Sequence, residues 1–516
     1  MKLTYVSHAC LLLEHAQHTV VTDPWFNGAA YLNQWHVFPK PADTSFTETA
    51  THILLTHGHE DHLHIPTLQL MNKNARVFFP YTWKDGTREI LEELGFTRIE
   101  EVHSMKKIKL GEDFFATFIV NGLDAFVVYE SEGKVMVNLN DALNAHHWSF
   151  VEMFTQTIRK NWKGVDLLIC GLGGASYFPN TVHAPGKDDK EIAVLREQFL
   201  THKFLEIAEE IKPKAILPFV PGFALLEKDK QWINEVKFPR NQLREYCKSY
   251  FPSLAQTEFY NLLPGDFIEN EIWNKSSPYH AQAINDNVSH LVQEQYAHEI
   301  EKANTHETVS CKTVDELCKG LQKILPVSQS GIAHELLAQI DFVIAFKDVA
   351  EQKFIHCYFE NNHVQAKVVS EIPSQINIRI TTFTFRLKHA VEELWGGDVF
   401  YIGYGADIYI LKSDCLKDNI DIVSLRLLSR FPSASHHIKL QPLRAAKYFS
   451  ANPQYALLAI KQKMIMRGNM NKLPYNERSH WVEKGKCDVC RLCDIPLLSD
   501  EFGNELKNYG AEVLNI

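Results

Sequence analysis

Residues 51–66 have the sequence THILLTHGHEDHLHIP, and this stretch decides the fold. Its first part, 52–55, is short, apolar and partly β-branched, so it predicts a buried strand, and the polar cluster after it predicts the loop at that strand's end. The spacing gives two imidazoles to one metal ion and a carboxylate with a further imidazole to a second, because side chains leave a tight loop in different directions. The four potential ligands are His57, His59, Asp61 and His62.

The alternative interpretation of this stretch is a solvated histidine-rich turn, since the chain has 25 histidines. The spacing and the strand that precedes the loop favour the metal site. The run resembles the HxHxDH signature of the metallo-β-lactamase superfamily. That resemblance implies an α/β fold with two sheets between helices, the αββα sandwich. Predicted strands come first and then alternate with helices, as this fold requires, so we assign residues 1–270 to it.

The length and composition predict a cytoplasmic globular protein of two or three domains. The 516 residues, 45% hydrophobic and 22% charged, have an ordinary globular balance. A net charge of −10 and a pI of about 6.2 count against a nucleic acid partner, which would need a basic surface. No apolar run is long enough to cross a bilayer, and the first ten residues lack a signal-peptide pattern, so we expect no membrane partner.

The rest of the chain predicts three further regions. Residues 271–306 predict a linker with some helix, residues 307–434 an α+β domain, and residues 435–516 a mainly helical region. In the α+β domain we expect consecutive antiparallel strands over 341–346, 353–359, 364–370 and 376–380, a helix over 382–394 and a strand-like run over 399–410. This order resembles sterol-carrier-like modules, which enclose an apolar ligand; a packing or dimerisation domain is the alternative.

Further metal ligands are expected at later strand ends. Asp141 ends the strand of a hairpin and matches a carboxylate that bridges two metal ions; a surface turn is the alternative. Metal hydrolases of this fold commonly add a third and a last histidine. Here His103 is the one histidine between residues 65 and 141, and the segment 217–222 has none. The ligand set is therefore incomplete by hydrolase standards.

Four more residues are candidates for roles around the metal ions. Asp124 and His183 could fill the missing ligand positions, with hydrogen-bonding or surface roles as the alternative. His8 and Asp23 fall at strand ends near the site, and we expect them to orient a metal-bound imidazole by hydrogen bonding.

Several separated segments resemble the catalytic domain of CMP-N-acetylneuraminate hydroxylase and its bacterial relatives. These segments are TDPW at 22–25, LHIPTL at 63–68, GGASYFP at 173–179 and PF at 218–219. The resemblance covers about the first half of the chain and implies a diiron oxygenase. That hydroxylase also carries a Rieske iron–sulfur domain, whereas this sequence has no Cys-x-His pair to hold such a cluster. We therefore expect an external electron donor.

A cysteine cluster near the C-terminus has two interpretations. Cys487, Cys490 and Cys493 follow one another at intervals of three, with His480 as a possible fourth donor. The spacing suits part of an iron–sulfur or zinc site, and it also suits plain reduced thiols.

The preferred function is a diiron oxygenase that hydroxylates a small organic or nucleotide-linked substrate, with Asp61 and Asp141 as its catalytic carboxylates. The first alternative is a dinuclear zinc hydrolase of an ester, lactone or phosphoester, in which the metal ions activate water. The second is a scaffold that binds without catalysis. Imidazole and carboxylate ligands suit iron and zinc alike, so the sequence leaves the choice of metal open.

Overall fold

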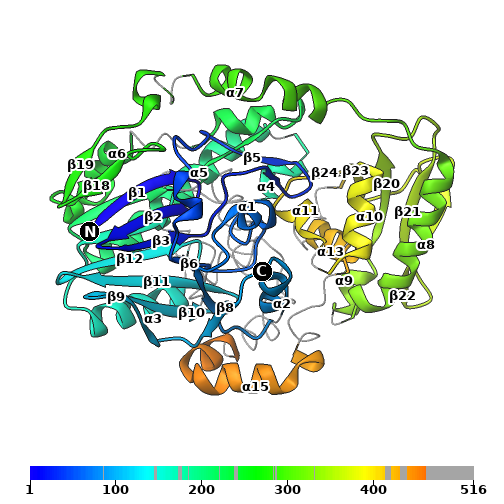
Figure 1. Ribbon diagram of the computed structural model, residues 1–516. Helices are drawn as coiled ribbons and strands as arrows, with labels where there is room; N and C mark the ends of the chain where they lie inside the picture. The colour runs from blue at the N-terminus through cyan, green and yellow to red at the C-terminus, as the bar shows by residue number, and fades with distance from the viewer. Residues whose placement is uncertain are drawn as a thin grey trace.

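The computed structural model describes residues 1–460 apart from 85, 144–147, 173–176, 184, 187, 220, 238–241, 283, 285–286, 331, 395, 413–419 and 431–437. Its first half contains two large sheets (Figure 1). The first sheet contains, in order across it, β19 (Ile272–Asn274), β18 (Phe267–Glu269), β1 (Lys2–Ser7), β2 (Cys10–His15), β3 (His18–Thr22), β6 (His52–Leu54), β7 (Arg76–Pro80) and β8 (Arg98–Val102). The second contains β17 (Glu258–Phe259), β15 (Ala215–Phe219), β13 (Leu167–Gly171), β12 (Lys134–Asn140), β11 (Asp124–Ser131), β10 (Phe114–Asn121) and β9 (Lys107–Gly111).

Apolar side chains fill the space between these two sheets. Leu11 and Leu13 lie two residues apart on β2 and so face the same way, toward the second sheet. Phe118 and Val120 of β10 and Val127 of β11 meet them in one buried cluster. Burying each such side chain stabilises the fold by roughly 1.5–3 kcal/mol. The two sheets are therefore held face to face by a continuous core.

Helices cover the outer face of each sheet. Those on the first sheet are α1 (Ile65–Leu70) and α2 (Thr87–Glu93), and those on the second are α3 (Trp148–Asn161), α5 (Asp189–Ile211) and α6 (Leu243–Tyr250). Leu68 of α1 and Leu91 of α2 pack with Val77 of β7. Ile158 of α3 and Phe204 of α5 lie in the cluster that covers the second sheet. The layers run helix, sheet, sheet, helix, which confirms the predicted αββα sandwich.

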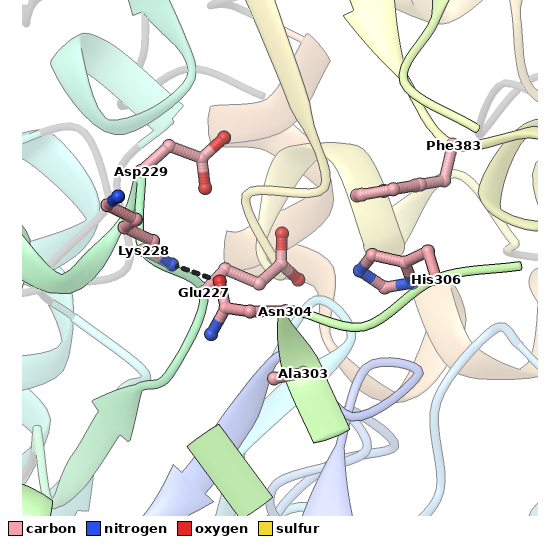
Figure 2. A pocket seen from close by; sticks show the side chains of 7 residues that line it. All are labelled: Glu227, Lys228, Asp229, Ala303, Asn304, His306 and Phe383. Atoms are coloured by element: carbon pink, nitrogen blue, oxygen red, sulfur yellow. Dashed lines mark hydrogen bonds between the residues drawn. The ribbon is translucent and has the colours of Figure 1, made fainter. Parts of the chain in front are cut away.

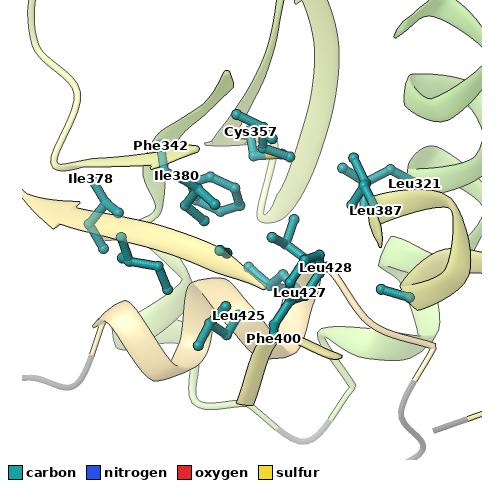
Figure 3. Close-up of a cluster of buried hydrophobic side chains, with 14 of the residues drawn as sticks. Leu321, Phe342, Cys357, Ile378, Ile380, Leu387, Phe400, Leu425, Leu427 and Leu428 are labelled. Atoms are coloured by element: carbon teal, nitrogen blue, oxygen red, sulfur yellow. The ribbon is translucent and has the colours of Figure 1, made fainter. Parts of the chain in front are cut away.

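A separate sheet forms most of the second half of the chain. It contains β14 (Val182–His183), β24 (Ala406–Ile410), β23 (Ile378–Thr382), β20 (Asp341–Phe346), β21 (Phe354–Glu360) and β22 (His363–Val369). Helices α8 (Cys311–Ser328), α9 (His334–Leu337), α10 (Thr384–Glu392), α11 (Asp398–Tyr401) and α13 (Ile420–Leu427) contribute to its core. Figure 3 shows part of this core, to which Leu321 of α8, Leu387 of α10 and Cys357 of β21 all belong.

Two details of this sheet differ from the expectation. β20, β21 and β22 are antiparallel, but β23 pairs with β20 in parallel, because the chain returns from the β22 edge to the opposite side of β20. Residues 399–401, expected to be strand-like, belong to helix α11. Val399 and Phe400 are both buried, although the backbone is helical. A short run of apolar residues is typical of a buried strand and of a buried helix alike, so the sequence did not distinguish the two.

The first strand of this sheet comes from the sandwich half of the chain. Val182 of β14 pairs with Ile408 of β24, and Ile192 and Leu200 of α5 belong to the same apolar core as the second half. The two halves therefore share a sheet edge and a core.

The segment between the halves packs against the sandwich. In the range 271–306, expected to be a linker, β19 pairs with β18, and α7 (Val288–Ala303) buries Leu291 and Tyr296 against Phe38. The Tyr296 hydroxyl donates a hydrogen bond to the Val37 carbonyl. A small fourth sheet, β16 (Phe223–Leu225), β5 (Trp35–Val37) and β4 (Ala29–Ala30), lies beside this helix.

Helix α15 (Pro442–Ala451) lies in the described part of the predicted C-terminal helical region. Ala445 and Tyr448 belong to the core between the two large sheets, and the Tyr448 hydroxyl accepts a hydrogen bond from the Gly122 amide at 3.0 Å. Figure 1 shows the helix against the lower end of the sandwich. Among the described helices, none is both long enough and apolar enough to cross a membrane.

Truncating a side chain between the sheets should destabilise the whole fold. Leu13 is fully buried, so Leu13→Ala removes apolar contacts and leaves a cavity, and we expect a loss of about 2–5 kcal/mol in the free energy of unfolding by urea. Leu443→Ala is the control, because Leu443 is 86% exposed and its truncation should change that free energy by less than about 0.5 kcal/mol. Equal effects of the two substitutions would contradict the described core.

Candidate metal centre

The candidate centre lies where strand ends of both large sheets meet. His57, His59, Asp61 and His62 follow β6 of the first sheet, and Asp141 follows β12 of the second. Asp23 follows β3, whose parallel pairing with β6 brings the two strand ends side by side. The backbone amide of Asp23 donates to the Leu54 carbonyl at 2.9 Å, which closes this corner.

The backbone around the centre is strained at several positions. His8, Asp23, Tyr31 and Asn140 have φ angles of +39°, +36°, +53° and +50°. These are left-handed values that side chains other than glycine rarely adopt, and each such residue costs on the order of 1–3 kcal/mol. Residues of this kind gather at functional sites, where the surrounding contacts hold them in place.

Asp23 orients the imidazole of His62. Its buried carboxylate accepts hydrogen bonds from the Thr56 amide at 2.7 Å, the Thr56 hydroxyl at 2.8 Å and Asn140 Nδ2 at 2.5 Å. The same carboxylate lies 3.5 Å from His62 Nδ1, which leaves His62 Nε2 facing the other donors. The role predicted for Asp23, to orient a metal-bound imidazole, stays a prediction. Sequence reasoning missed Asn140, although its position next to Asp141 at a strand end was a signal.

His57, His62 and Asp141 form the first group of donors. One ligand atom of each lies within 4.8 Å of the others. His62 Nε2 is 3.2 Å from Asp141 Oδ2, and His57 Nε2 is 2.8 Å from His59 Nδ1. Imidazole nitrogens and a carboxylate oxygen therefore converge on one small volume.

His8, Asp61 and His62 form the second group. Asp61 Oδ2 is 3.0 Å from His8 Nε2 and 3.3 Å from His62 Nε2. The backbone amide of Gly222 donates to His8 Nδ1 at 3.0 Å, so Nδ1 carries no proton and Nε2–H donates to Asp61. The segment that lacks the expected last histidine thus supplies an amide that orients His8.

The donor atoms fit a pair of metal ions. His62 Nε2 is completely buried and has no hydrogen-bond partner, although two carboxylates lie within 3.3 Å of it. Burial alone lowers the pKa of His62, but the surrounding carboxylates, Asp61 foremost, hold it well above its usual range. Burial raises the pKa of Asp61, and the neighbouring imidazoles of His62 and His8 outweigh that effect and lower it. Buried donors aimed at one another in this way are stabilised by bound cations.

Asp124 and His183, the candidates for the missing ligands, lie in different surroundings. Asp124 begins β11; burial raises its pKa to about 6, and it interacts electrostatically with His59 and Asp141. His183 lies in β14, with Nδ1 2.6 Å from Asp189 Oδ2 and Nε2 3.2 Å from Asp407 Oδ1. Both ring nitrogens of His183 therefore face carboxylates at the junction of the two halves, and we do not carry it into the proposed ligand set.

The structure adds residues that the sequence did not single out. The Tyr31 hydroxyl donates to Asp61 Oδ1 at 2.5 Å, and the Tyr31 amide donates to Glu60 Oε2 at 2.7 Å. Asp398 reaches the centre from helix α11: burial raises its pKa, and the charges of His59 and Lys84 oppose the rise. No local spacing in the sequence connects residue 398 with the metal loop, so no signal there could have found it.

A surface hollow of about 450 Å³ lies at the junction of the two halves (Figure 2). It is lined by Glu227, Lys228, Asp229, Ala303, Asn304, His306 and Phe383. The Lys228 amide donates to Asn304 Oδ1 at 2.8 Å, and the rings of His306 and Phe383 lie 4.0 Å apart. None of these residues belongs to a donor group. Outside the described residues lie the loop 173–176 and Cys487, Cys490, Cys493 and His480.

Residues 2–144 match the family model of the Beta-lactamase superfamily domain. The first half of the chain has the metallo-β-lactamase fold. The chain is 26% identical over 285 residues to the cytidine monophosphate-N-acetylneuraminic acid hydroxylase of Danio rerio. The alignment covers 52% of this chain and 46% of the relative. The chain thus spans less than half the length of this relative.

Three further proteins are similar to parts of this chain. The 4-amino-L-phenylalanyl peptidyl-carrier-protein 3-hydroxylase of Streptomyces venezuelae is 32% identical over 120 residues, 21% of each chain. The solved structure of CmlA, described as a diiron β-hydroxylase from the same species, aligns with a TM-score of 0.35 at 20% identity, covering 51% of this chain and 53% of that one. An isothiocyanate hydrolase from Delia radicum gut bacteria aligns with a TM-score of 0.34 at 14% identity, covering 52% of this chain and 98% of that one.

Removing an imidazole from the metal loop should lower bound metal without unfolding the protein. We expect His57→Ala and His62→Ala each to reduce the metal content per chain in elemental analysis, because a lost donor weakens binding while the sheets still bury the core. His334→Ala is the matched control, since His334 is exposed and belongs to neither donor group. Full metal content in both loop variants would refute the site.

Proposed function

We propose that the chain is a metal-dependent hydroxylase, and more closely a diiron oxygenase that acts on a small organic or nucleotide-linked substrate. The observation that carries this proposal is the pair of donor groups that share His62 inside the metallo-β-lactamase fold. The names of two relatives add support, because both describe hydroxylases.

Five residues would hold the two metal ions. They are His57, His59, Asp61, His62 and Asp141: the donor groups contain four of them, His59 Nδ1 lies 2.8 Å from His57 Nε2, and Asp124 is a further carboxylate candidate. Imidazole with carboxylate is a ligand set that suits iron. The sequence 215–222 contains no histidine, which leaves a coordination position for a small ligand. A bound iron pair would supply the activation of O₂.

The surrounding residues hold the donors in place. His8 Nε2–H donates to Asp61, and the Asp23 carboxylate lies 3.5 Å from His62 Nδ1, so His62 Nε2 faces the other donors. Hydroxylation converts a C–H bond, O₂, two electrons and two protons into C–OH and water. The protein must therefore receive two electrons from an external donor.

The substrate would approach between the metal loop and helix α11. Asp398 of α11 and Lys84 of the segment after β7 interact electrostatically with each other, and the charge of Asp398 also interacts with that of His59. A charge of each sign beside the metal loop favours a small polar substrate over an apolar one.

A dinuclear zinc hydrolase of an ester, lactone or phosphoester is the second candidate. The same five donors suit zinc, and two ions bridged by a carboxylate can lower the pKa of bound water. A scaffold that binds without catalysis is the third candidate. The strained residues beside the donors, His8, Asp23 and Asn140, speak against it, because a plain binding surface gains nothing from their cost.

Iron and oxygen chemistry test the first candidate directly. We expect protein grown without metal bias to contain iron, and the chemically reduced protein to show an absorbance change in a stopped-flow instrument when it meets oxygenated buffer. The change should require prior reduction, because the unreduced protein lacks the two electrons that O₂ activation consumes.

The control is His57→Ala treated in the same way, which should show no oxygen-dependent change. Three results would together establish the hydrolase instead. They are zinc at near-full occupancy, no oxygen-dependent absorbance change after iron reconstitution, and turnover of a generic ester or phosphodiester.

A further inference from the structure

Three consecutive residues before β5 have left-handed backbone. Tyr31, Leu32 and Asn33 have φ angles of +53°, +55° and +63°, and none of them is glycine. Such residues are found one at a time in most proteins, because the Cβ atom crowds the following carbonyl. A run of three persists only where contacts on both sides hold it.

The turn 31–33 places the Tyr31 hydroxyl on the metal loop. Tyr31 is 2% exposed, and its hydroxyl donates to Asp61 Oδ1 at 2.5 Å. Because Oδ1 is engaged, Oδ2 is the oxygen that faces His62 Nε2 at 3.3 Å.

The metal loop holds one side of this turn. Glu60, the residue before Asp61, accepts a hydrogen bond from the Tyr31 amide through Oε2 at 2.7 Å. Tyr31 therefore contacts two adjacent residues of the loop, one through its backbone and one through its side chain.

The second half of the chain holds the other side. Gln34 Nε2 donates to the Tyr31 carbonyl at 2.6 Å and to the Val399 carbonyl at 3.1 Å. Gly403 and Gly405 lie so close to the Gln34 amide group that a Cβ atom on either would overlap it. The hydrogen bond to Val399 and the close approach of the two glycines therefore connect the turn to residues 399–405, which run from helix α11 to β24.

An aromatic contact closes the same junction. Tyr404 is 1% exposed and has a φ of +63°, and its ring lies 5.7 Å from that of Trp35. Tyr31 also packs on Trp35, with ring centroids 5.0 Å apart. A side chain of the second half is thus buried in the same cluster as the tyrosine that contacts Asp61.

We propose that Tyr31 is a positioning residue for the metal-binding carboxylate of Asp61, and that residues 399–405 of the second half keep it in position. This inference rests on the proposed metal site. The second half of the chain then sets the affinity of the centre for one of its metal ions, although neither donor group contains a residue of that half.

Cobalt titration tests the role of Tyr31. Metal-free full-length protein is titrated with Co²⁺, and visible absorption reports the binding steps and the coordination geometry. For the natural sequence we expect two steps. For Tyr31→Phe we expect one step to weaken by about 10–100-fold, with a changed spectrum, while the other step stays as it was. Tyr279→Phe is the matched control, because its buried hydroxyl donates to the Lys40 carbonyl at 2.8 Å, far from the donors.

Gln34→Met tests the contact with the second half. The substitution keeps a similar volume and removes both donated hydrogen bonds, so it should weaken the same step as Tyr31→Phe. The double variant should bind no more weakly than Tyr31→Phe alone, since both changes act on one contact. A merely structural effect would instead add to that of Tyr31→Phe and would weaken both steps alike.

Two results overturn the inference, and a third overturns the site itself. Two unchanged steps in Tyr31→Phe would show that the hydroxyl does not position Asp61. Unchanged binding in Gln34→Met would remove the role of residues 399–405. If the natural sequence binds fewer than two Co²⁺ ions, the proposed dinuclear site is wrong, a failure seen before any variant is compared.

Discussion

The buried carboxylate of Asp23 is the constraint on which the centre depends. A charge removed from water is costly unless hydrogen bonds satisfy it, and here Thr56 and Asn140 supply three donors. Asp23 follows β3, Thr56 follows β6 and Asn140 ends β12, so one carboxylate connects strand ends of both sheets. A shift of either sheet would leave that charge unpaired. The same contacts aim His62 at the other donors, so the packing of the sandwich and the geometry of the centre depend on each other.

The sequence predicted those parts of the fold and centre that depend on neighbours along the chain. The strand over Asp341–Phe346 has the expected bounds, because most of its residues are apolar and two are β-branched. His57, His59, Asp61 and His62 could be found because one strand end carries them all. Asp141 could be found because a hairpin strand ends there.

The sequence could not predict contacts made across long separations. Tyr31 and Asp398 reach the metal loop from outside any motif, and their roles depend on how the two halves dock. His183 looked like a ligand because it follows a glycine-rich loop, yet its partner Asp407 is 224 positions away. The polar composition of 271–306 suggested a linker, although α7 buries one apolar face against the sandwich. In each case the contact that determines the residue's role joins residues far apart in the sequence, so local composition could not predict it.

Strand β14 has a consequence for dissecting the chain into parts. This strand belongs to the sandwich half of the chain, but it is the edge strand of the six-stranded sheet of the second half, where Val182 pairs with Ile408 of β24. A recombinant fragment beginning near residue 307 would leave β24 as an open edge with free amides and carbonyls, and such edges recruit strands from other molecules. It would also lose Ile192 and Leu200 from its core. Aggregation of that fragment would reflect a missing edge strand rather than an unstable domain.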